Sequence, residues 1–342
     1  MTELKALMAQ AAEFPPEPGD FRQIGDVLVW MRLPIPGRLN HINVWLLRTA
    51  GGWLLVDTGM AIPPVEEAWR GLESRLPALA GMERILVTHH HPDHFGMAAR
   101  LAAARGIEVH ISAAAAAASR VDHDPGDFDR ELATFADRVG FEPEPEFGDF
   151  LSGRRYRSII SGAPPRAATL GEGQGIATQA GTFSVSLHDG HAPGHACLHA
   201  ADTGLLVSGD QVLPHISPNI SLYPDIADED PLGDYLESLE RLADVPPGTV
   251  VLPAHGRPFT GLHGRLDALR AEHEERLARI LQTCRPGART GEIVATLFRL
   301  SRLDSLNRLL ATAETLAHLR HLERRGQLSA QGHGPALRWV ST

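Results

Sequence analysis

Side chains of the kinds that bind metal ions are concentrated in one short segment. Positions 88–94 read Thr-His-His-His-Pro-Asp-His, so that His89, His91, Asp93 and His94 fall within six residues. Imidazole and carboxylate groups are ligands of Zn²⁺, Fe and Mn, and a group this dense can hold parts of two ions. The alternative, a solvated histidine-rich loop, does not account for Asp and Gly at fixed places in the same pattern. The segment therefore predicts a metal centre.

The residues before this cluster predict a buried strand that ends at it. Residues 84–88 read Arg-Ile-Leu-Val-Thr, a short apolar run with β-branched side chains. Pro92 disfavours helix at His91 and favours a bend or a helix start directly afterwards. We therefore expect the four donors to lie on a turn and to converge on one small volume.

The pattern His-x-His-x-Asp-His resembles the signature of the metallo-β-lactamase superfamily. Four further segments resemble motifs of that family and occur in the family's order: Leu54–Gly59, His191–His195, Leu205–Asp210 and Val250–Gly256. Each segment alone is a weak signal, because strands that end in Gly-Asp are common. Five in the right order between residues 54 and 256 form a specific one.

The resemblance implies a dinuclear metal centre, with two Zn²⁺ ions expected and Fe or Mn as alternatives. The implied ligands are His89, His91 and His195 for the first ion, Asp93, His94 and His255 for the second, and Asp210 as the bridge. Asp57 is implied to position the ligand loops without binding metal. Three imidazoles leave an open position for water, and a hydroxide shared by two ions is a nucleophile near neutral pH.

The order of predicted elements indicates an α/β fold. Residues 42–47 and 53–56 predict a hairpin, and a helix at about 65–75 leads to the strand before the cluster. The resemblance implies a four-layer αββα sandwich over residues 21–259, after an N-terminal arm of residues 1–20. An insertion at about 121–170, interrupted by Pro and Gly, is a candidate lid over the active-site mouth.

Residues 260–342 predict a separate module. A helix, a short helix, a long helix and a small strand pair follow one another, which resembles a winged helix. A similar tail occurs in the metallo-β-lactamase subgroup that resembles human β-lactamase-like protein 2. The module contains thirteen Arg and no Lys against eight Asp and Glu, a balance of +5, whereas residues 1–259 carry −15. Nucleic-acid binding, packing on the metal domain and homodimer formation are its three alternatives.

Several residues are candidates for contact with substrate. Arg154, Arg155 and Arg157 in the insertion form either an exposed basic turn or a clamp for an anionic substrate, because guanidinium pairs bidentately with carboxylate or phosphate. His215 follows the Gly-Asp segment closely and is a candidate to contact substrate or supply a proton. Tyr223 is a weaker candidate of the same kind.

Composition bounds the class of protein. The 342 residues are 43% hydrophobic, which suffices for a buried core, and the formal net charge is −10. Only two cysteines are present and they do not form a Cys-x-x-Cys pair, so neither a structural disulfide nor a thiolate metal site is expected. No apolar stretch approaches the length of a membrane span, and we expect a cytoplasmic protein without a membrane partner.

These observations favour a hydrolase that uses two metal ions to cleave a small acyl substrate: a thioester, an ester or a lactone. The resemblance implies attack by a metal-bridging hydroxide, with Asp93 as a ligand that also orients the nucleophile. A phosphodiesterase or endoribonuclease of the β-lactamase-like protein 2 type is one alternative, because a basic winged helix can bind nucleic acid. A non-catalytic, metal-binding regulatory protein is the other.

Overall fold

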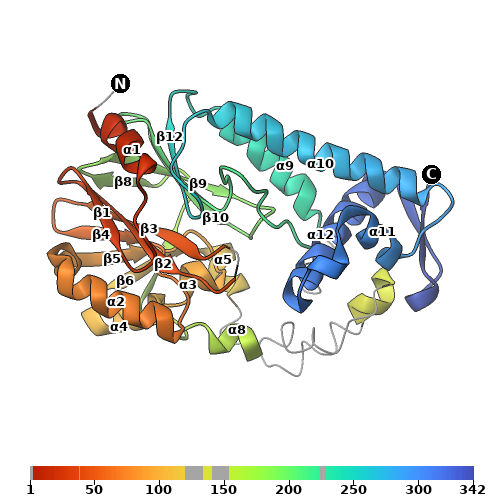
Figure 1. Ribbon diagram of the computed structural model, residues 1–342, viewed down its shortest axis with the longest axis horizontal. Helices are drawn as coiled ribbons and strands as arrows, with labels where there is room; N and C mark the ends of the chain where they lie inside the picture. Colours follow the sequence, from red (N-terminus) through yellow and green to blue (C-terminus); the bar gives the residue numbers. More distant parts are fainter. Residues whose placement is uncertain (1–2, 38, 120–133, 141–153, 224–225, 227–228) are drawn as a thin grey trace.

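Two β-sheets that face each other form the centre of the computed structural model (Figure 1). The structure describes residues 3–37, 39–119, 134–140, 154–223, 226 and 229–342. Over these residues the first sheet has the order β1 (Phe21–Ile24), β2 (Leu28–Pro34), β3 (His41–Arg48), β4 (Trp53–Val56), β5 (Met82–Leu86), β6 (Glu108–Ser112) and β7 (Ala167–Leu170). The second has the order β12 (Val250–Pro253), β11 (Leu205–Gly209), β10 (His195–Ala200), β9 (Gly181–His188) and β8 (Gly175–Thr178).

Helices cover the outer face of each sheet. The first sheet carries α2 (Pro63–Arg75), η1 (Pro77–Gly81), α3 (Pro92–Phe95), α4 (Ala98–Arg105) and α5 (Ala113–Ala118). The second carries α9 (Pro231–Leu242), whose Leu232, Tyr235 and Leu239 pack against Leu206 and Val251 of the sheet. The expected four-layer αββα sandwich is therefore confirmed.

Side chains that alternate in direction along the strands divide the core into an inner layer between the two sheets and an outer layer beneath the helices. On β2, Leu28 and Trp30 face the second sheet, while Val29 and Met31 face the helices. Successive side chains of a strand point to opposite faces, so one fully buried strand contributes to both layers. Trp30 stacks on Trp45 of β3 between the sheets, with ring centroids 5.7 Å apart.

The N-terminal segment is a helix that belongs to this core. In the predicted N-terminal arm, residues 1–20, α1 (Glu3–Glu13) buries Met8 completely, in the same inner layer as Ile24 and Leu28. Lys5 also donates a hydrogen bond to the carbonyl of Gly248, 2.8 Å away, and so ties the helix to the second sheet.

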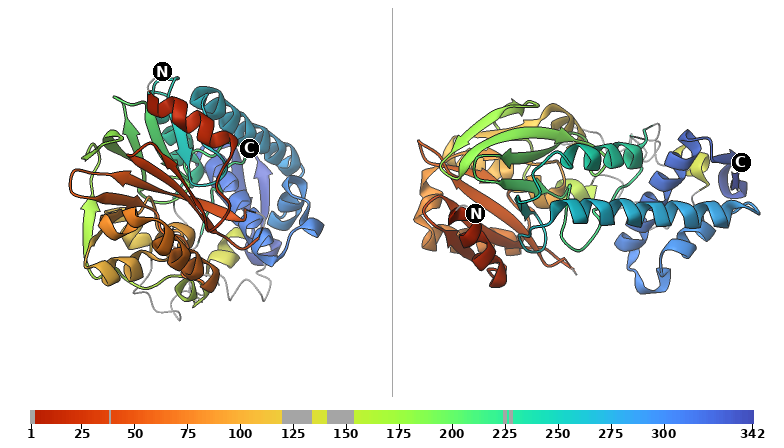
Figure 2. Two further views of the ribbon diagram at one scale, coloured as in Figure 1. Left: turned by 60° about the vertical axis from the view of Figure 1, so that its left-hand side comes forward. Right: turned by 90° about the horizontal axis from the view of Figure 1, so that it is seen from above.

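The C-terminal region has the expected succession of elements. They are α10 (Leu262–Cys284), α11 (Thr290–Leu297), η3 (Leu300–Arg302), α12 (Ser305–Arg324), β13 (Leu328–Gln331), η4 (Gly334–Ala336) and β14 (Arg338–Ser341), with β13 and β14 antiparallel. Figure 2 shows α10 running from the sandwich out to the other C-terminal helices. Leu266 of α10, Leu316 of α12 and Leu239 of α9 lie in one apolar cluster, so this region and the sandwich share a core. Among the described residues, no helix is long and apolar enough to cross a membrane.

The described parts of the insertion pack against both the C-terminal helices and the histidine segment. Residues 134–139 are helical, and Phe135 and Val139 are buried in the cluster that contains the C-terminal helices. In α8 (Arg154–Ser158), the Tyr156 hydroxyl donates a hydrogen bond of 2.6 Å to the carbonyl of His90. Residues 120–133 and 141–153 lie outside the described part of the chain, so the lid stays a prediction.

Candidate metal centre

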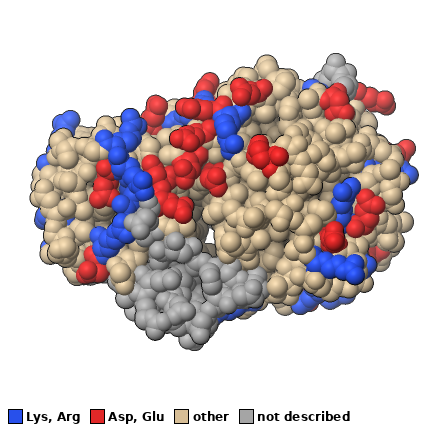
Figure 3. All heavy atoms as spheres, turned by 180° about the vertical axis from the view of Figure 1, so that it is seen from behind, with Lys and Arg blue, Asp and Glu red and all other residues tan. Residues whose placement is uncertain are grey.

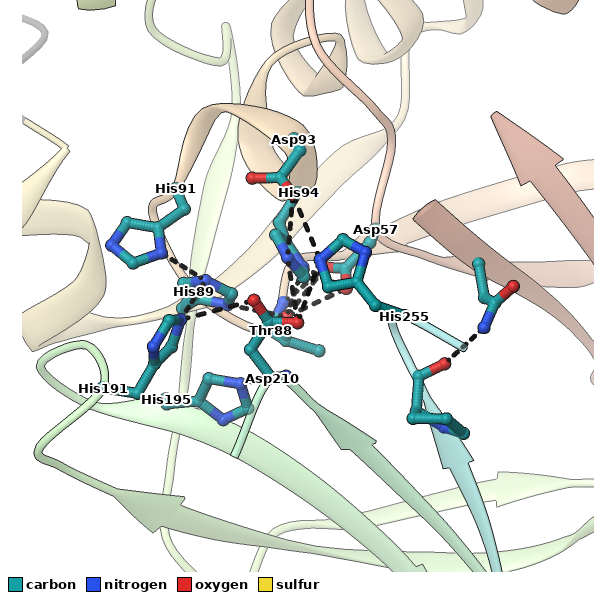
Figure 4. Close-up of polar contacts among 12 residues, drawn as sticks. Asp57, Thr88, His89, His91, Asp93, His94, His191, His195, Asp210 and His255 are labelled. Carbon is teal, nitrogen blue, oxygen red and sulfur yellow. Dashed lines mark hydrogen bonds and ion pairs between the residues drawn. The ribbon is translucent and has the colours of Figure 1, made fainter. Parts of the chain in front are cut away.

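The metal-binding side chains meet at one edge of the sandwich because of the strand directions (Figure 4). β4 and β5 are parallel, as are β11 and β12, so their carboxyl ends lie side by side. Asp57, the His89–His94 segment, Asp210 and His255 each follow one of these ends. β10 runs antiparallel to β11, so the loop before it, with His191, reaches the same edge.

The turn after β5 folds as Pro92 dictates. His91 has the extended backbone required before a proline, with φ −59° and ψ 147°, and Pro92 is the first residue of α3. The amide of His94 then donates to the carbonyl of His91. One turn of helix thus brings the His94 side chain, which is completely buried, back towards His89.

Among the residues that the structure describes, three overlapping groups of donor atoms could each hold a cation. They are His89, His91 and His191; His89, His94 and Asp210; and Asp93, His94 and His255. In the first group, His89 Nε2 lies 2.9 Å from His91 Nδ1 and 3.2 Å from His191 Nε2. In the third, His255 Nε2 lies 3.3 Å from Asp93 Oδ2.

Asp210 lies between the two outer groups. One of its oxygens, Oδ2, is 3.4 Å from His191 Nε2. The other, Oδ1, is 3.5 Å from His94 Nε2 and 3.3 Å from His255 Nε2. A single carboxylate therefore faces histidines of both groups.

His195, the expected third ligand of the first ion, belongs to none of these groups. Its Nε2 instead accepts a hydrogen bond of 3.1 Å from the backbone amide of Asp210. Its ring stacks on His89, with centroids 4.7 Å apart. A Cβ on Gly209, where φ is +51°, would come within 2.5 Å of His195 Nε2. The structure thus places His191 among the donors and His195 beneath them, as a support for Asp210.

The Asp57 carboxylate lies behind the donors. Its Oδ1 accepts the Thr88 amide at 2.8 Å, and its Oδ2 accepts from His94 Nδ1 at 2.8 Å. The Thr88 hydroxyl is 2.9 Å from Asp57 Oδ2 and 3.1 Å from His89 Nδ1. Asp57 has a positive φ of 63°, which Asp tolerates better than most residues. Thr88, which the sequence analysis did not single out, thus connects both halves of the centre to Asp57.

Four histidines of the centre share one hydrogen-bonding arrangement that suits metal ligands. The Nδ1 of each lies 2.8–3.1 Å from an acceptor atom of the protein. The pairs are His89 with Thr88 Oγ1, His94 with Asp57 Oδ2, His191 with the Asn219 carbonyl, and His255 with the His41 carbonyl. A proton on Nδ1 leaves the lone pair of Nε2 for a metal ion, and such partners are typical of metal-binding histidines.

The electrostatics divide the centre into a neutral half and a charged half. Burial, with nearby histidines, holds the pKa of His89 and of His91 well below the ordinary value. Burial opposes charge on His255 as well, but the Asp210 and Asp93 carboxylates raise its pKa to about 10. Burial also opposes ionisation of Asp210, yet His255 and His94 hold its pKa well below the usual range.

Unpaired buried atoms support the fit of a cation. His94 Nε2 and Asp210 Oδ1 are both buried and face each other at 3.5 Å, yet neither forms a hydrogen bond among the described residues. Buried polar atoms are rarely left in this state, because each costs roughly 1–3 kcal/mol. Nitrogen and carboxylate oxygen donors with unpaired atoms at their centre fit divalent cations such as Zn²⁺.

The predicted substrate contacts are not brought into the donor groups. His215 is exposed, and Tyr223 is half-buried on the same loop. Arg157 is half-buried on α8. The side chains of Arg154 and Arg155 lie outside the described residues. The roles of all five stay predictions.

A sequence model of the metallo-beta-lactamase superfamily matches residues 37–255. The chain belongs to this superfamily. A second model, the metallo-beta-lactamase-like C-terminal domain, matches residues 277–339. The matched ranges contain the whole donor cluster and most of the C-terminal region.

Relatives extend over most of the chain. A solved beta-lactamase domain protein from Burkholderia ambifaria is 34% identical, with a TM-score of 0.85, and covers 98% of this chain and 100% of its own. The "Probable metallo-hydrolase YqjP" of Bacillus subtilis is 29% identical over 70% of this chain and 75% of its own length. The "Acyl-coenzyme A thioesterase MBLAC2" of Gallus gallus is 28% identical over 70% and 80%, respectively. Together with the donor cluster, the family membership identifies a metal-dependent hydrolase.

Proposed function

We propose that this superfamily member hydrolyses a small acyl substrate, a thioester, an ester or a lactone, at a centre of two metal ions. The position of Asp210 carries the two-metal part of the proposal. Its oxygens lie 3.3–3.5 Å from three different histidines, on both sides of the centre. One carboxylate so placed suits two cations held a few ångströms apart.

The described residues divide into two ligand sets. His89, His91 and His191 would hold the first ion, Asp93, His94 and His255 the second, and Asp210 would bind both. Two divalent ions in such a site activate water near neutral pH and polarise the carbonyl oxygen under attack. Zn²⁺ suits these ligands best, and Fe or Mn are alternatives.

Other side chains of the chain would keep these donors in place. Asp57 holds His94 and the turn that begins at Thr88, while His195 holds the backbone of Asp210. Asp93 is the more exposed carboxylate of the centre, at 15% against 10% for Asp210. We assign it the second role of accepting a hydrogen bond from the attacking water, and so of orienting that water towards the acyl carbon.

Two observations favour an acyl substrate over RNA. A relative named as an acyl-coenzyme A thioesterase covers most of the chain. The charge of residues 1–259, −15, would repel a polyanion near the centre. Figure 3 shows one face on which a short stripe of basic side chains lies beside a band of acidic ones.

The experiment compares substrates side by side. Protein loaded with Zn²⁺ is assayed on acyl-coenzyme A thioesters, simple esters, lactones and single-stranded RNA. His91→Ala is the inactive variant, and His333→Ala, which changes an exposed histidine of the C-terminal region, is the matched control. We expect acyl hydrolysis that is lost only in His91→Ala. RNA cleavage that is lost in His91→Ala, without acyl hydrolysis, would establish the phosphodiesterase alternative instead. No hydrolysis with bound metal would favour the regulatory alternative.

A further inference from the structure

We infer that α12 of the C-terminal region positions the candidate ligand His191 through Asn219, which makes this region a structural part of the metal centre. The inference rests on the proposed two-metal site. It assigns positioning roles to Asn219 and Glu314 and gives the C-terminal region a function in metal binding. The link runs from α12 through the loop between β11 and α9 to His191.

The first step of the link is the contact that sets the tautomer of His191. Its Nδ1 lies 3.0 Å from the carbonyl oxygen of Asn219. A carbonyl can only accept, so Nδ1 carries the proton and Nε2 keeps its lone pair. Nε2 is the atom that faces His89 Nε2 and Asp210 Oδ2, at 3.2 and 3.4 Å. The position of the Asn219 carbonyl therefore fixes the rotation of this ring and, when the ring is neutral, its tautomer.

The second step is the attachment of Asn219 to α12. Its side-chain amide donates to Glu314 Oε2 at 3.3 Å and to the Leu310 carbonyl at 3.4 Å. Ser221 donates to the amide oxygen of Asn219. Close by on the loop, the amide of Leu222 donates to the carbonyl of Ala313 at 3.0 Å. The loop is thus held against α12 at Asn219 and at Leu222.

The third step is the anchoring of Glu314 itself. Its side chain is 10% exposed, and its Oε1 forms an ion pair of 2.8 Å with Arg276 of α10. A carboxylate buried to this degree needs a partner, because an unpaired buried charge costs several kcal/mol. One oxygen of Glu314 is therefore committed to α10, and the other is directed at Asn219. Ser217, also on the loop, lies 3.3 Å from His273 of α10 and adds a second attachment.

Two variants remove different parts of this link. Glu314→Gln removes the ion pair with Arg276 and leaves Asn219 with an altered partner. Asn219→Ala removes the amide held by α12 but leaves the Glu314–Arg276 pair intact. The matched control is Glu323→Gln, since Glu323 lies on the same helix in an ion pair with Arg320. The full chain is used throughout.

The readouts are metal affinity and the tautomer of His191. Zn²⁺ affinity is measured by competition with a chelator, and the tautomer by ¹⁵N chemical shifts of histidine in the metal-free protein. Loss of a hydrogen-bond partner of a metal-binding histidine lowers metal affinity about 10–100-fold. Because Glu314 and Asn219 act one step further away, we expect about tenfold weaker binding of one of the two ions in each variant. We also expect the Nδ1–H population of His191 to fall, with Glu323→Gln like the wild type.

Wild-type affinity and an unchanged His191 tautomer in both variants would overturn the inference. If Glu314→Gln does not fold, Asn219→Ala decides by the same criteria. His191→Ala distinguishes this failure from that of the ligand assignment. If His191→Ala loses one ion while the two variants behave as wild type, only the inference fails. If His191→Ala retains both ions, the assignment of His191 fails, and the inference with it.

Discussion

Asp57→Asn should weaken the binding of the second metal ion without disturbing the fold. Asn tolerates the positive φ of 63° found here, so the backbone is preserved. The new amide can still accept the Thr88 N–H through its oxygen, which then directs its NH₂ group at His94 Nδ1. His94 must then accept at Nδ1 and carry its proton on Nε2, the atom that faces Asp210. The tautomer that binds metal is lost.

The size of this effect follows from the contact that is removed. A hydrogen bond to a charged group contributes roughly 1.5–3 kcal/mol. Loss of a partner of a metal-binding histidine costs about 10–100-fold in affinity, or about 1.4–2.8 kcal/mol. The two figures agree, and we expect the second Zn²⁺ to bind about 10–100-fold more weakly.

The assay is Zn²⁺ titration against a competing chelator, with stoichiometry from inductively coupled plasma mass spectrometry. Asp20→Asn is the matched control. Asp20 is a half-exposed carboxylate in an ion pair with Arg75, and it is not one of the side chains of the metal centre. Two ions bound to Asp57→Asn with wild-type affinity would refute the reasoning about the tautomer.

Three further predictions concern the same centre. In the metal-free protein, His255 has a pKa of about 10, above the ordinary 6.5, so the stability it contributes is present below pH 6.5 and lost as the pH rises to 10. The melting temperature of the metal-free protein should fall as the pH rises from 6.5 to 10, and an increase would contradict the pairing of charged His255 with Asp210 and Asp93. His191→Ala should lose one of two Zn²⁺ ions by mass spectrometry, whereas His195→Ala should retain both; the reverse would restore His195 as the ligand. Gly209→Ala places a Cβ within 2.5 Å of His195 Nε2 and should lower the free energy of unfolding by about 1–3 kcal/mol in denaturant titrations. Unchanged stability would show that His195 can move.

Much of the fold could be predicted because its signals are local. The hairpin of β3 and β4, the helix α2 and the C-terminal succession of helices and strand pair all follow apolar periodicity and turn residues. The metal cluster is also local, since one turn around Pro92 fixes four donors. The family resemblance supplied the order of the remaining segments.

What the sequence left open depends on how distant segments meet. His191 and His195 have the same side chain and lie four residues apart, so their types do not distinguish them. His195 begins β10, and the pairing of that strand with β9 and β11 directs its ring beneath Asp210. His191 lies on the free loop before the strand and can reach the donors. The position of His191 in the loop before the strand was the feature of the sequence that favoured it as a ligand.

The C-terminal region illustrates the same difference. Its helices could be predicted one by one, but their packing on the loop that carries Asn219 comes from contacts between residues about ninety positions apart. The net charge of +5 on residues 260–342 suggested nucleic acid as one partner. Ion pairs inside the region, such as Arg276 with Glu314, show that some of its arginines have structural partners within the chain.

The central claim is that two metal ions lie on either side of Asp210. Anomalous diffraction from a crystal of the Zn²⁺-loaded protein, recorded at the zinc absorption edge, tests it most directly. We expect two peaks, one among His89, His91 and His191 and one among Asp93, His94 and His255, with Asp210 in contact with both. A single peak, or a peak bound by His195 instead of His191, would contradict it.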